Sequence, residues 1–217
     1  MIKPIFSLFL CFLSIVHSNA LFDSTNTVQK IGTTIDFAKV FVNVDFLTAV
    51  IYYRNIPQVE AIAPLFAEFS ETKKDFYRFV AVDCDLIDQD ENKHVLPACQ
   101  DEFRAHLPLI VFLEPHAERV DPKTKKLTEP AQHKFEGTVT TEALNSFAEK
   151  IMPHFSKTLN SLEDHENFIA ANAQLNKVLL LINENTLPPY WKALASRFRD
   201  SLAVNISFMF HCPSFDM

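Results

Sequence analysis

The stretch AVIYYRNIPQVEAIAPLFAEF, from Ala49 to Phe69, decides the fold of this chain. It begins as an apolar, aromatic run over Ala49 to Tyr53, which predicts a strand. A short polar segment, Arg54 to Pro57, then interrupts the run. Apolar side chains recur after it in steps of three and four residues, the spacing of one helix face: Val59, Ile62, Phe66 and Phe69. In many α/β proteins the ligand-binding or catalytic residues lie where a strand runs into a helix N-terminus.

Four residues of this stretch, Tyr52, Ala61, Ala63 and Pro64, carry a family resemblance. When the segment FYAPWCGHCKALAP is laid without a gap on Ile51 to Pro64, its tyrosine and its A-x-A-P coincide with those four residues. That segment is the active-site pattern of thioredoxins and protein disulfide isomerases, which this chain therefore resembles. The resemblance implies a thioredoxin fold, an α/β architecture in which helices flank a central mixed sheet.

The two cysteines of the family pattern fall on Ile56 and Val59, and the residues between them are Pro57 and Gln58. Dithiol exchange needs a thiolate at a helix N-terminus and a second thiol one turn further on. The buried acid of the family, two residues before the tyrosine, falls on Val50. The resemblance therefore implies a redox-inactive site with no catalytic residue at these positions and no cofactor.

Composition excludes several other classes of protein. The chain has 217 residues, 48% hydrophobic residues and a formal net charge of −7, as expected for a folded, acidic protein. Since no basic stripe is present, we expect no nucleic-acid partner. The eight histidines show no metal-ligand spacing, and the acidic loop Asp83 to Glu91 lacks the spacing and the glycine of a calcium loop, so we predict no metal.

Residues 1–20 resemble a secretory signal peptide. Lys3 is followed by an apolar run from Ile5 to Val16, and Ser18 and Ala20 are small residues at a plausible cleavage site. No later stretch has the length and apolarity that a membrane span needs, so we expect none in the mature chain. These features predict a product in the endoplasmic reticulum lumen or secreted from the cell.

We expect a first domain over residues 21–153 with the order of a disulfide-isomerase thioredoxin domain. The predicted strands and helices alternate along the chain, with a long polar loop over residues 114–134. In chain order the predicted elements are helix Thr34–Val42, strand Thr48–Tyr53, helix Val59–Phe76, strand Arg78–Cys84, helix Leu96–Arg104, strand Leu109–Leu113, strand Phe135–Gly137 and helix Thr141–Ile151.

Residues 154–217 predict an incomplete second thioredoxin-like domain. Ser161 is predicted to cap a helix that runs to about Ala171. A strand of the buried type, Lys177 to Ile182, follows, then a helix opened by Pro188 and Pro189, and then an alternating strand from Val204. A unit of about 60 residues buries too little surface to be secure alone. We therefore expect that it packs on the first domain or on a partner, or that the chain is a truncated product.

The resemblance also assigns roles to residues outside the central stretch. Pro108, just before the apolar strand LIVFL, matches the cis-proline that faces the active-site helix in the family. Ile56, Pro57, Leu107 and Pro108 would then form an apolar surface for extended polypeptide, although core filling explains Ile56 and Val59 equally well.

Two further predictions concern the cysteines and one asparagine. Cys84 and Cys99 occupy places where some disulfide-isomerase domains carry a cysteine pair, and two unpaired, buried thiols are the alternative. Cys212 would then be the odd thiol, available to a partner or a dimer. Asn205-Ile206-Ser207 is a glycosylation sequon.

The sequence thus favours a redox-inactive, polypeptide-binding or chaperone-like module of the secretory pathway, and a binding protein over an enzyme. One alternative is a weak thiol-disulfide oxidoreductase or isomerase that uses Cys84, Cys99 or Cys212. Another is an accessory luminal domain of a glycosylation complex.

Overall fold

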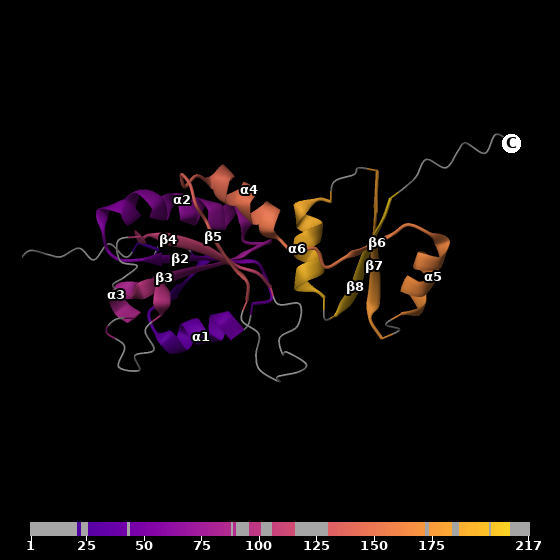
Figure 1. The fold of residues 1–217 in the computed structure, drawn as a ribbon, viewed down its shortest axis with the longest axis horizontal. Coiled ribbons are helices and arrows are strands. Elements are labelled where there is room, and N and C mark those ends of the chain that lie inside the picture. Colours follow the sequence, from indigo (N-terminus) through magenta and orange to yellow (C-terminus); the bar gives the residue numbers. More distant parts are fainter. Residues whose placement is uncertain are drawn as a thin grey trace, which may run out of the picture.

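The computed structural model describes residues 21–22, 26–42, 44–87, 89, 96–100, 106–115, 130–171, 174–183, 187–199 and 201–208. They form two β-sheets, one of five strands and one of three, which lie side by side along the long axis of the molecule (Figure 1). The larger sheet comes from the first two thirds of the chain and the smaller one from the last third.

The five-stranded sheet has the order β1-β3-β2-β4-β5. Strands β1, β3 and β2 are parallel, whereas β4 is antiparallel to β2 and β5 is antiparallel to β4. Its strands are β1 (Val28–Ile31), β2 (Thr48–Tyr53), β3 (Arg78–Asp83), β4 (Leu109–Leu113) and β5 (Gln132–Lys134). The mixed sheet predicted from the sequence is therefore confirmed.

Two pairs of helices cover the two faces of this sheet. Helices α2 (Pro57–Lys73) and α4 (Thr141–Ile151) lie on one face, and α1 (Thr34–Val42) and the short α3 (Cys84–Ile87) lie on the other (Figure 1). Every side chain of β2 is buried, as its apolar sequence predicts.

The alternation of side chains along β2 divides the core into two layers. Ala49, Ile51 and Tyr53 face α2 and α4, whereas Val50 and Tyr52 face α1. The α2 layer is aromatic: Phe69 is fully buried and its ring centroid lies 5.2 Å from that of Phe79, edge to face. The largest fully buried side chains of this layer are Phe22, Phe66, Phe69, Phe79 and Phe112. Burying each phenylalanine contributes roughly 1.5–3 kcal/mol, so α2 is held mainly by its apolar face.

Two predicted elements of the first unit differ in form or place from the prediction. The helix expected over Leu96–Arg104 is a single 3-10 turn, Pro97–Cys99, and residues 101–105 lie outside the described part. The strand expected over Phe135–Gly137 is instead Gln132–Lys134, because pairing with β4 ends at the Val111–Lys134 pair. Gly137 follows with a φ of 139°, a conformation that suits glycine.

The acidic segment after β3 opens as a helix and not as a loop. The Asp83 carboxylate accepts hydrogen bonds from the backbone N–H groups of Asp85 (3.0 Å) and Leu86 (3.3 Å). These are donors that a helix N-terminus leaves unpaired, so Asp83 stabilises the first turn of α3.

The second sheet is parallel throughout and has the order β6-β8-β7. Its elements are β6 (Lys157–Leu159), α5 (Leu162–Ala170), β7 (Asn176–Ile182), α6 (Pro189–Arg197) and β8 (Leu202–Phe208). The sequence did not predict β6, because three residues are too few to show a period. The capping residue predicted for α5 is confirmed, since Ser161 and Asp164 form a reciprocal capping box.

The prediction that β7 is buried on both faces is wrong. Leu179 is 37% exposed and Leu181 is 53% exposed. On the other face, Val178 and Leu180 pack against a small core under α6 that contains Trp191. Helix α6 covers one face of β7 and Leu179 and Leu181 remain exposed on the other, so the apolar sequence of this strand does not imply two covered faces.

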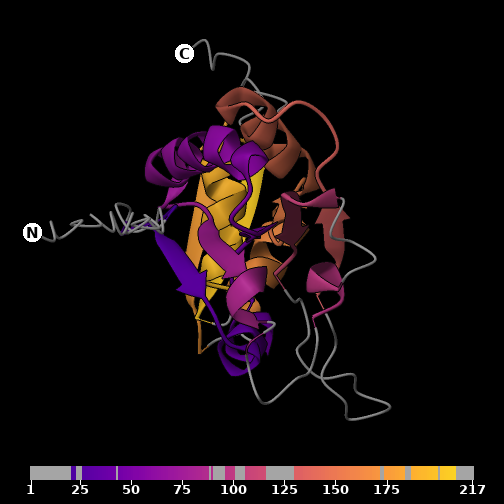
Figure 2. The same cartoon turned by 90° about the vertical axis from the view of Figure 1, so that its left-hand side faces the viewer.

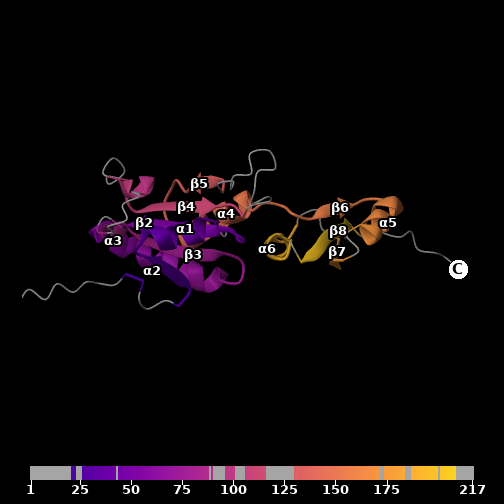
Figure 3. The ribbon, with the colours of Figure 1, turned by 90° about the horizontal axis from the view of Figure 1, so that it is seen from below.

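Helix α6 lies between the two sheets and packs against the first one (Figures 1 and 3). Ala193 is buried in the aromatic core layer of the first unit. The Lys192 ammonium donates to the carbonyl oxygen of Glu149 at 3.4 Å, and the Ser196 hydroxyl donates to that of Asp45 at 3.3 Å. Viewed along the long axis, the second sheet lies behind the first (Figure 2). Of the arrangements expected for residues 154–217, the structure therefore favours packing on the first unit.

Candidate functional site

The candidate site lies where β2 passes into α2. Strand β2 ends at Tyr53 and the helix begins at Pro57, with Ile56 at the N-cap in an extended conformation (φ −125°, ψ 152°). Proline is suited to the first helical position, because the N–H that it lacks would have no partner within the helix. Pro57 and Gln58 are exposed, Ile56 is half-buried and Val59 is fully buried.

Pro108 lies beside this connection. The antiparallel register pairs Tyr52 with Leu109, so Pro108 falls opposite Tyr53 at the carboxyl end of β2. The Leu107–Pro108 peptide bond is cis, as the family resemblance implied. Leu107 is only 6% exposed and belongs to the core layer under α1, whereas Pro108 is half-buried. Ile56, Pro57 and Pro108 thus keep exposed apolar surface at this end of the sheet, whereas Leu107 is a core residue.

The positions of the family cysteines carry no ionisable side chain. Val59 packs in the aromatic core layer with Phe66 and Phe69, and Ile56 packs partly against the same layer. Val50 is fully buried among apolar neighbours on the opposite face of β2. Of the two residues that fill the cysteine positions, Val59 is a core residue and Ile56 is divided between the core and the surface.

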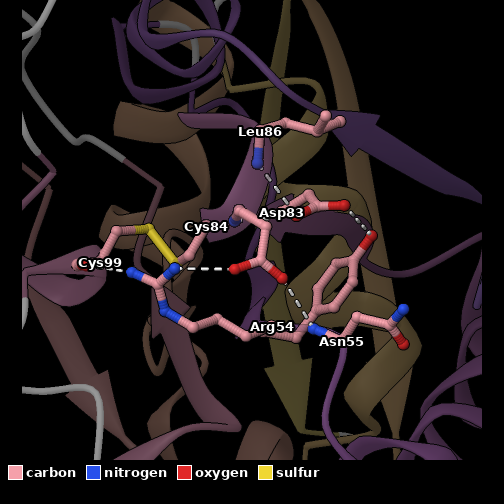
Figure 4. A network of polar contacts seen from close by, with 8 residues as sticks. Arg54, Asn55, Asp83, Cys84, Leu86 and Cys99 are labelled. Carbon is pink, nitrogen blue, oxygen red and sulfur yellow. Dashed lines mark hydrogen bonds and ion pairs between the residues drawn. A yellow bond between two sulfur atoms is a disulfide. The ribbon is translucent and has the colours of Figure 1, made fainter. Parts of the chain in front are cut away.

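A polar network that the sequence did not predict lies directly beside these positions (Figure 4). The Arg54 guanidinium donates from Nη1 to Oδ1 of Asp85 at 2.8 Å and from Nη2 to the carbonyl oxygen of Cys99 at 2.8 Å. The other carboxylate oxygen of Asp85 accepts the backbone N–H of Asn55 at 3.0 Å. One side chain thus joins the β2–α2 connection, the first turn of α3 and the 3-10 turn.

The burial of the Arg54 side chain explains why it has these partners. The Arg54 side chain is only 7% exposed, and a guanidinium group taken out of water needs charged and polar partners. Asp85 provides the opposite charge and remains 44% exposed. An arginine that directly follows a buried strand was the available signal in the sequence, but its partners lie 31 and 45 residues away.

Tyr53 and Asp83 extend the network toward the core. The Tyr53 hydroxyl donates to Oδ2 of Asp83 at 3.3 Å. Burial, together with the Asp83 carboxylate, raises the pKa of Tyr53 well above its usual range. The hydroxyl therefore remains a hydrogen-bond donor at every physiological pH.

Cys84 and Cys99 form a disulfide, as the resemblance implied. Cys84 opens α3, Cys99 ends the 3-10 turn, and the two residues are 15 positions apart. Their exposed fractions are 0% and 1%, so an attacking thiolate has little access to either sulfur. The disulfide and Arg54 hold the same 3-10 turn, one through a covalent bond and the other through the Cys99 carbonyl.

Two other predicted sites lie away from this region. Asn205 is in the central strand of the second sheet and is only 9% exposed, and its side-chain oxygen accepts the backbone N–H of Lys157 at 3.0 Å. A glycan would be attached to the amide nitrogen of this side chain, which has little room because the residue is buried within the sheet. Cys212 lies outside the described residues.

Comparisons with known proteins concern the fold. No protein-family profile matches the chain, and no curated protein matches it. Two crystal forms of ERdj5, form II and form I, align with 87% and 86% of the chain at TM-scores of 0.58 and 0.57, with 15% and 18% sequence identity. A structure of full-length ERdj5 aligns with 86% of the chain at a TM-score of 0.55 and 16% identity.

The fold is a thioredoxin fold. The chain spans 23% of the length of each of these three ERdj5 chains. In the described part of the chain, no helix combines the length and the apolar character needed to cross a membrane.

Proposed function

We propose that this chain is a redox-inactive thioredoxin-fold module of the secretory pathway that binds extended polypeptide. The observation that supports it most is the character of the helix α2 N-terminus. The place where this fold holds its thiols presents the apolar side chains of Ile56 and Pro57 beside Pro108.

An extended polypeptide suits this surface for two reasons. Apolar side chains that remain partly exposed on a rigid support lose little conformational entropy when they bind. Here the support is rigid, because Arg54 ties the β2–α2 connection to the 3-10 turn, and the Cys84–Cys99 disulfide ties that turn to α3. An extended peptide also directs alternate side chains to one side, so that its apolar residues can contact such a surface together.

Binding can be tested with a reduced, alkylated and fluorescently labelled polypeptide in an anisotropy titration. Pro57→Asp should weaken binding several-fold, because it places a charge in the apolar surface. The same change favours the helix, since an acidic side chain in the first turn interacts well with the helix dipole. Ile35→Asp is the matched control, because Ile35 is 54% exposed on α1, on the other face of the sheet. Equal affinities for the two variants would contradict the proposed surface.

An insulin-reduction assay tests the absence of redox activity. The wild-type chain should give no turnover above a protein-free reaction, since Cys84 and Cys99 are buried in a disulfide. Ile56→Cys combined with Val59→Cys supplies the positive control, because it restores two thiols at the helix N-terminus. Its activity should stay low, because Val50 cannot transfer protons. Turnover by the wild-type chain would instead favour the oxidoreductase alternative.

Location in the secretory pathway rests on residues 1–20 and can be tested separately. Expression of the full chain in animal cells should yield a luminal or secreted product whose N-terminal sequence begins at Leu21. A product that retains Met1 and stays in the cytosol would contradict this part of the proposal. The division into units 21–153 and 154–217 remains a prediction, which limited proteolysis near Pro153 would test.

A further inference from the structure

The disulfide and the candidate surface belong to one chain of contacts at the carboxyl end of β2 (Figure 4). Cys84 opens α3, and Asp85 follows it directly. The Asp85 carboxylate accepts from the Arg54 guanidinium at Oδ1 and from the backbone N–H of Asn55 at Oδ2. Arg54 also donates to the carbonyl oxygen of Cys99. Both members of the disulfide are thus linked to the β2–α2 connection, one through its neighbour in α3 and the other through the guanidinium.

These contacts reach the residue that precedes the apolar surface. Asn55 and Ile56 are consecutive, and the Ile56 backbone N–H donates to the Arg54 carbonyl oxygen at 2.9 Å. Ile56 is half-buried at the edge of the aromatic core layer, so apolar packing restrains only part of its side chain. The polar network therefore supplies the restraint on the side of the connection that faces α3.

The two ends of the disulfide differ in what else holds them. Helix α3 continues directly from β3, a central strand of the sheet, so Cys84 keeps its place through the main chain. The 3-10 turn that ends at Cys99 lies outside the sheet, and the disulfide joins it to α3 across 15 positions of sequence. Breaking the disulfide would therefore release the turn rather than the helix.

We propose that the oxidation state of the Cys84–Cys99 pair regulates polypeptide binding at the N-terminus of α2. The inference rests on the function proposed above and adds how that surface is controlled. In the oxidised chain the disulfide keeps the Cys99 carbonyl in reach of the Arg54 guanidinium. In the reduced chain the turn moves away, Arg54 loses this acceptor, and the connection becomes less ordered. A less ordered surface loses more conformational entropy on binding, so it binds polypeptide more weakly.

Reduction requires two molecules of a small monothiol such as glutathione. The first thiolate attacks one sulfur of the pair and forms a mixed disulfide, which the second thiolate resolves. Two electrons pass to the protein, each cysteine sulfur takes up one proton, and the reductant leaves as its own disulfide. Because Cys84 and Cys99 are 0% and 1% exposed, a thiolate reaches them through a local opening of the turn. That opening also separates Cys99 from Arg54, so reduction and the loss of this contact occur together.

Hydrogen exchange tests the coupling without a ligand. The oxidised full chain is compared with Cys84→Ala combined with Cys99→Ala, and the amides of α4 report any general opening of the first unit. Loss of the disulfide should speed exchange of the Asn55 and Ile56 amides by roughly tenfold more than exchange in α4, since both amides are hydrogen-bonded within the connection. The chemically reduced wild-type chain is a second sample, so the test does not depend on one variant. Unchanged exchange at these two amides would overturn the inference.

Arg54→Met is the matched variant, because it keeps the disulfide and removes the side chain through which Cys99 acts on the connection. In this background, loss of the disulfide should change the exchange of the Asn55 amide little further. A general loss of stability would instead add the same factor in both backgrounds. Equal effects of disulfide loss with arginine and with methionine at position 54 would contradict the proposed route.

Polypeptide binding provides the second readout. Affinity for the labelled polypeptide used above should fall roughly fivefold when the disulfide is lost, and little further in Arg54→Met. By linkage, saturating polypeptide should raise the ratio of oxidised to reduced wild-type chain in a glutathione buffer by the same factor. Equal affinities of the oxidised and disulfide-free chains would overturn the inference and leave the proposed function intact. Binding by neither form, with faster exchange of the Asn55 amide on disulfide loss, would support the coupling and contradict the polypeptide function alone.

Discussion

Replacing Arg54 by methionine should destabilise the first unit by about 2–4 kcal/mol, because two strong hydrogen bonds are lost together. The change removes the bonds to Asp85 and to the Cys99 carbonyl, both 2.8 Å long, and keeps most of the apolar stem in the core. Each bond that involves a charged group contributes about 1.5–3 kcal/mol. The contribution of the Asp85 pair falls below that range, to about 0.5–1 kcal/mol, because the Asp85 side chain is 44% exposed and water screens the pair.

Urea unfolding of the oxidised protein measures this loss. With a slope of ~2 kcal/mol per molar urea, the midpoint for Arg54→Met should fall by about 1–2 M. The Cys84–Cys99 disulfide must remain intact throughout, so that the change in free energy reports the hydrogen bonds alone. Asp85→Asn, alone and combined with Arg54→Met, completes a double-mutant cycle that isolates the coupling of the pair.

A second ion pair of the same length provides the control. The Lys39 ammonium lies 2.8 Å from the Asp36 carboxylate, but the two side chains are 69% and 47% exposed. Since exposed pairs contribute little, Lys39→Met should leave the midpoint almost unchanged. If Arg54→Met lowers the midpoint no more than Lys39→Met does, burial is not what makes the Arg54 network stabilising, and the network does not hold the β2–α2 connection as proposed.

Three further predictions concern the disulfide, His154 and the sequon. Cys84→Ala combined with Cys99→Ala should lose about 3 kcal/mol in urea unfolding, because it opens a loop of about 15 residues; an unchanged midpoint would contradict this. Burial and the Lys192 charge lower the pKa of His154, so the folded protein resists its protonation and stability should fall as pH drops below about 6.5. Thermal unfolding of His154→Gln should show a flatter dependence between pH ~7.5 and ~5.5, and a slope equal to that of the wild type would exclude this role. Because Asn205 is buried, it should carry no glycan in the folded product, so glycosidase treatment of the secreted protein should leave its mass unchanged; a mass loss that Asn205→Gln abolishes would show that the sequon is used.

The sequence alone determined the central segment of the fold. The bounds of β2 and α1 agree with the prediction, and α2 begins within two residues of the predicted start. These elements can be predicted because their sequence patterns are local. An unbroken apolar run predicts a buried strand, and apolar residues in steps of three and four predict a helix face. Pro64 inside α2 did not break the helix, since it lies on the exposed side where water can pair with the carbonyl left without its partner. The sequence likewise showed that positions 56 and 59 carry no thiol.

Only the tertiary structure decided what surrounds the candidate site. The partners of Arg54 lie 31 and 45 residues from it, and no local pattern identifies which of several carboxylates or carbonyls a buried guanidinium will meet. The exposure of Leu181 and the three-residue strand β6 depend on which strands lie next to one another, which a two-residue period cannot specify. Local periodicity fixes each element, whereas the contacts between elements follow from the packing of the whole chain.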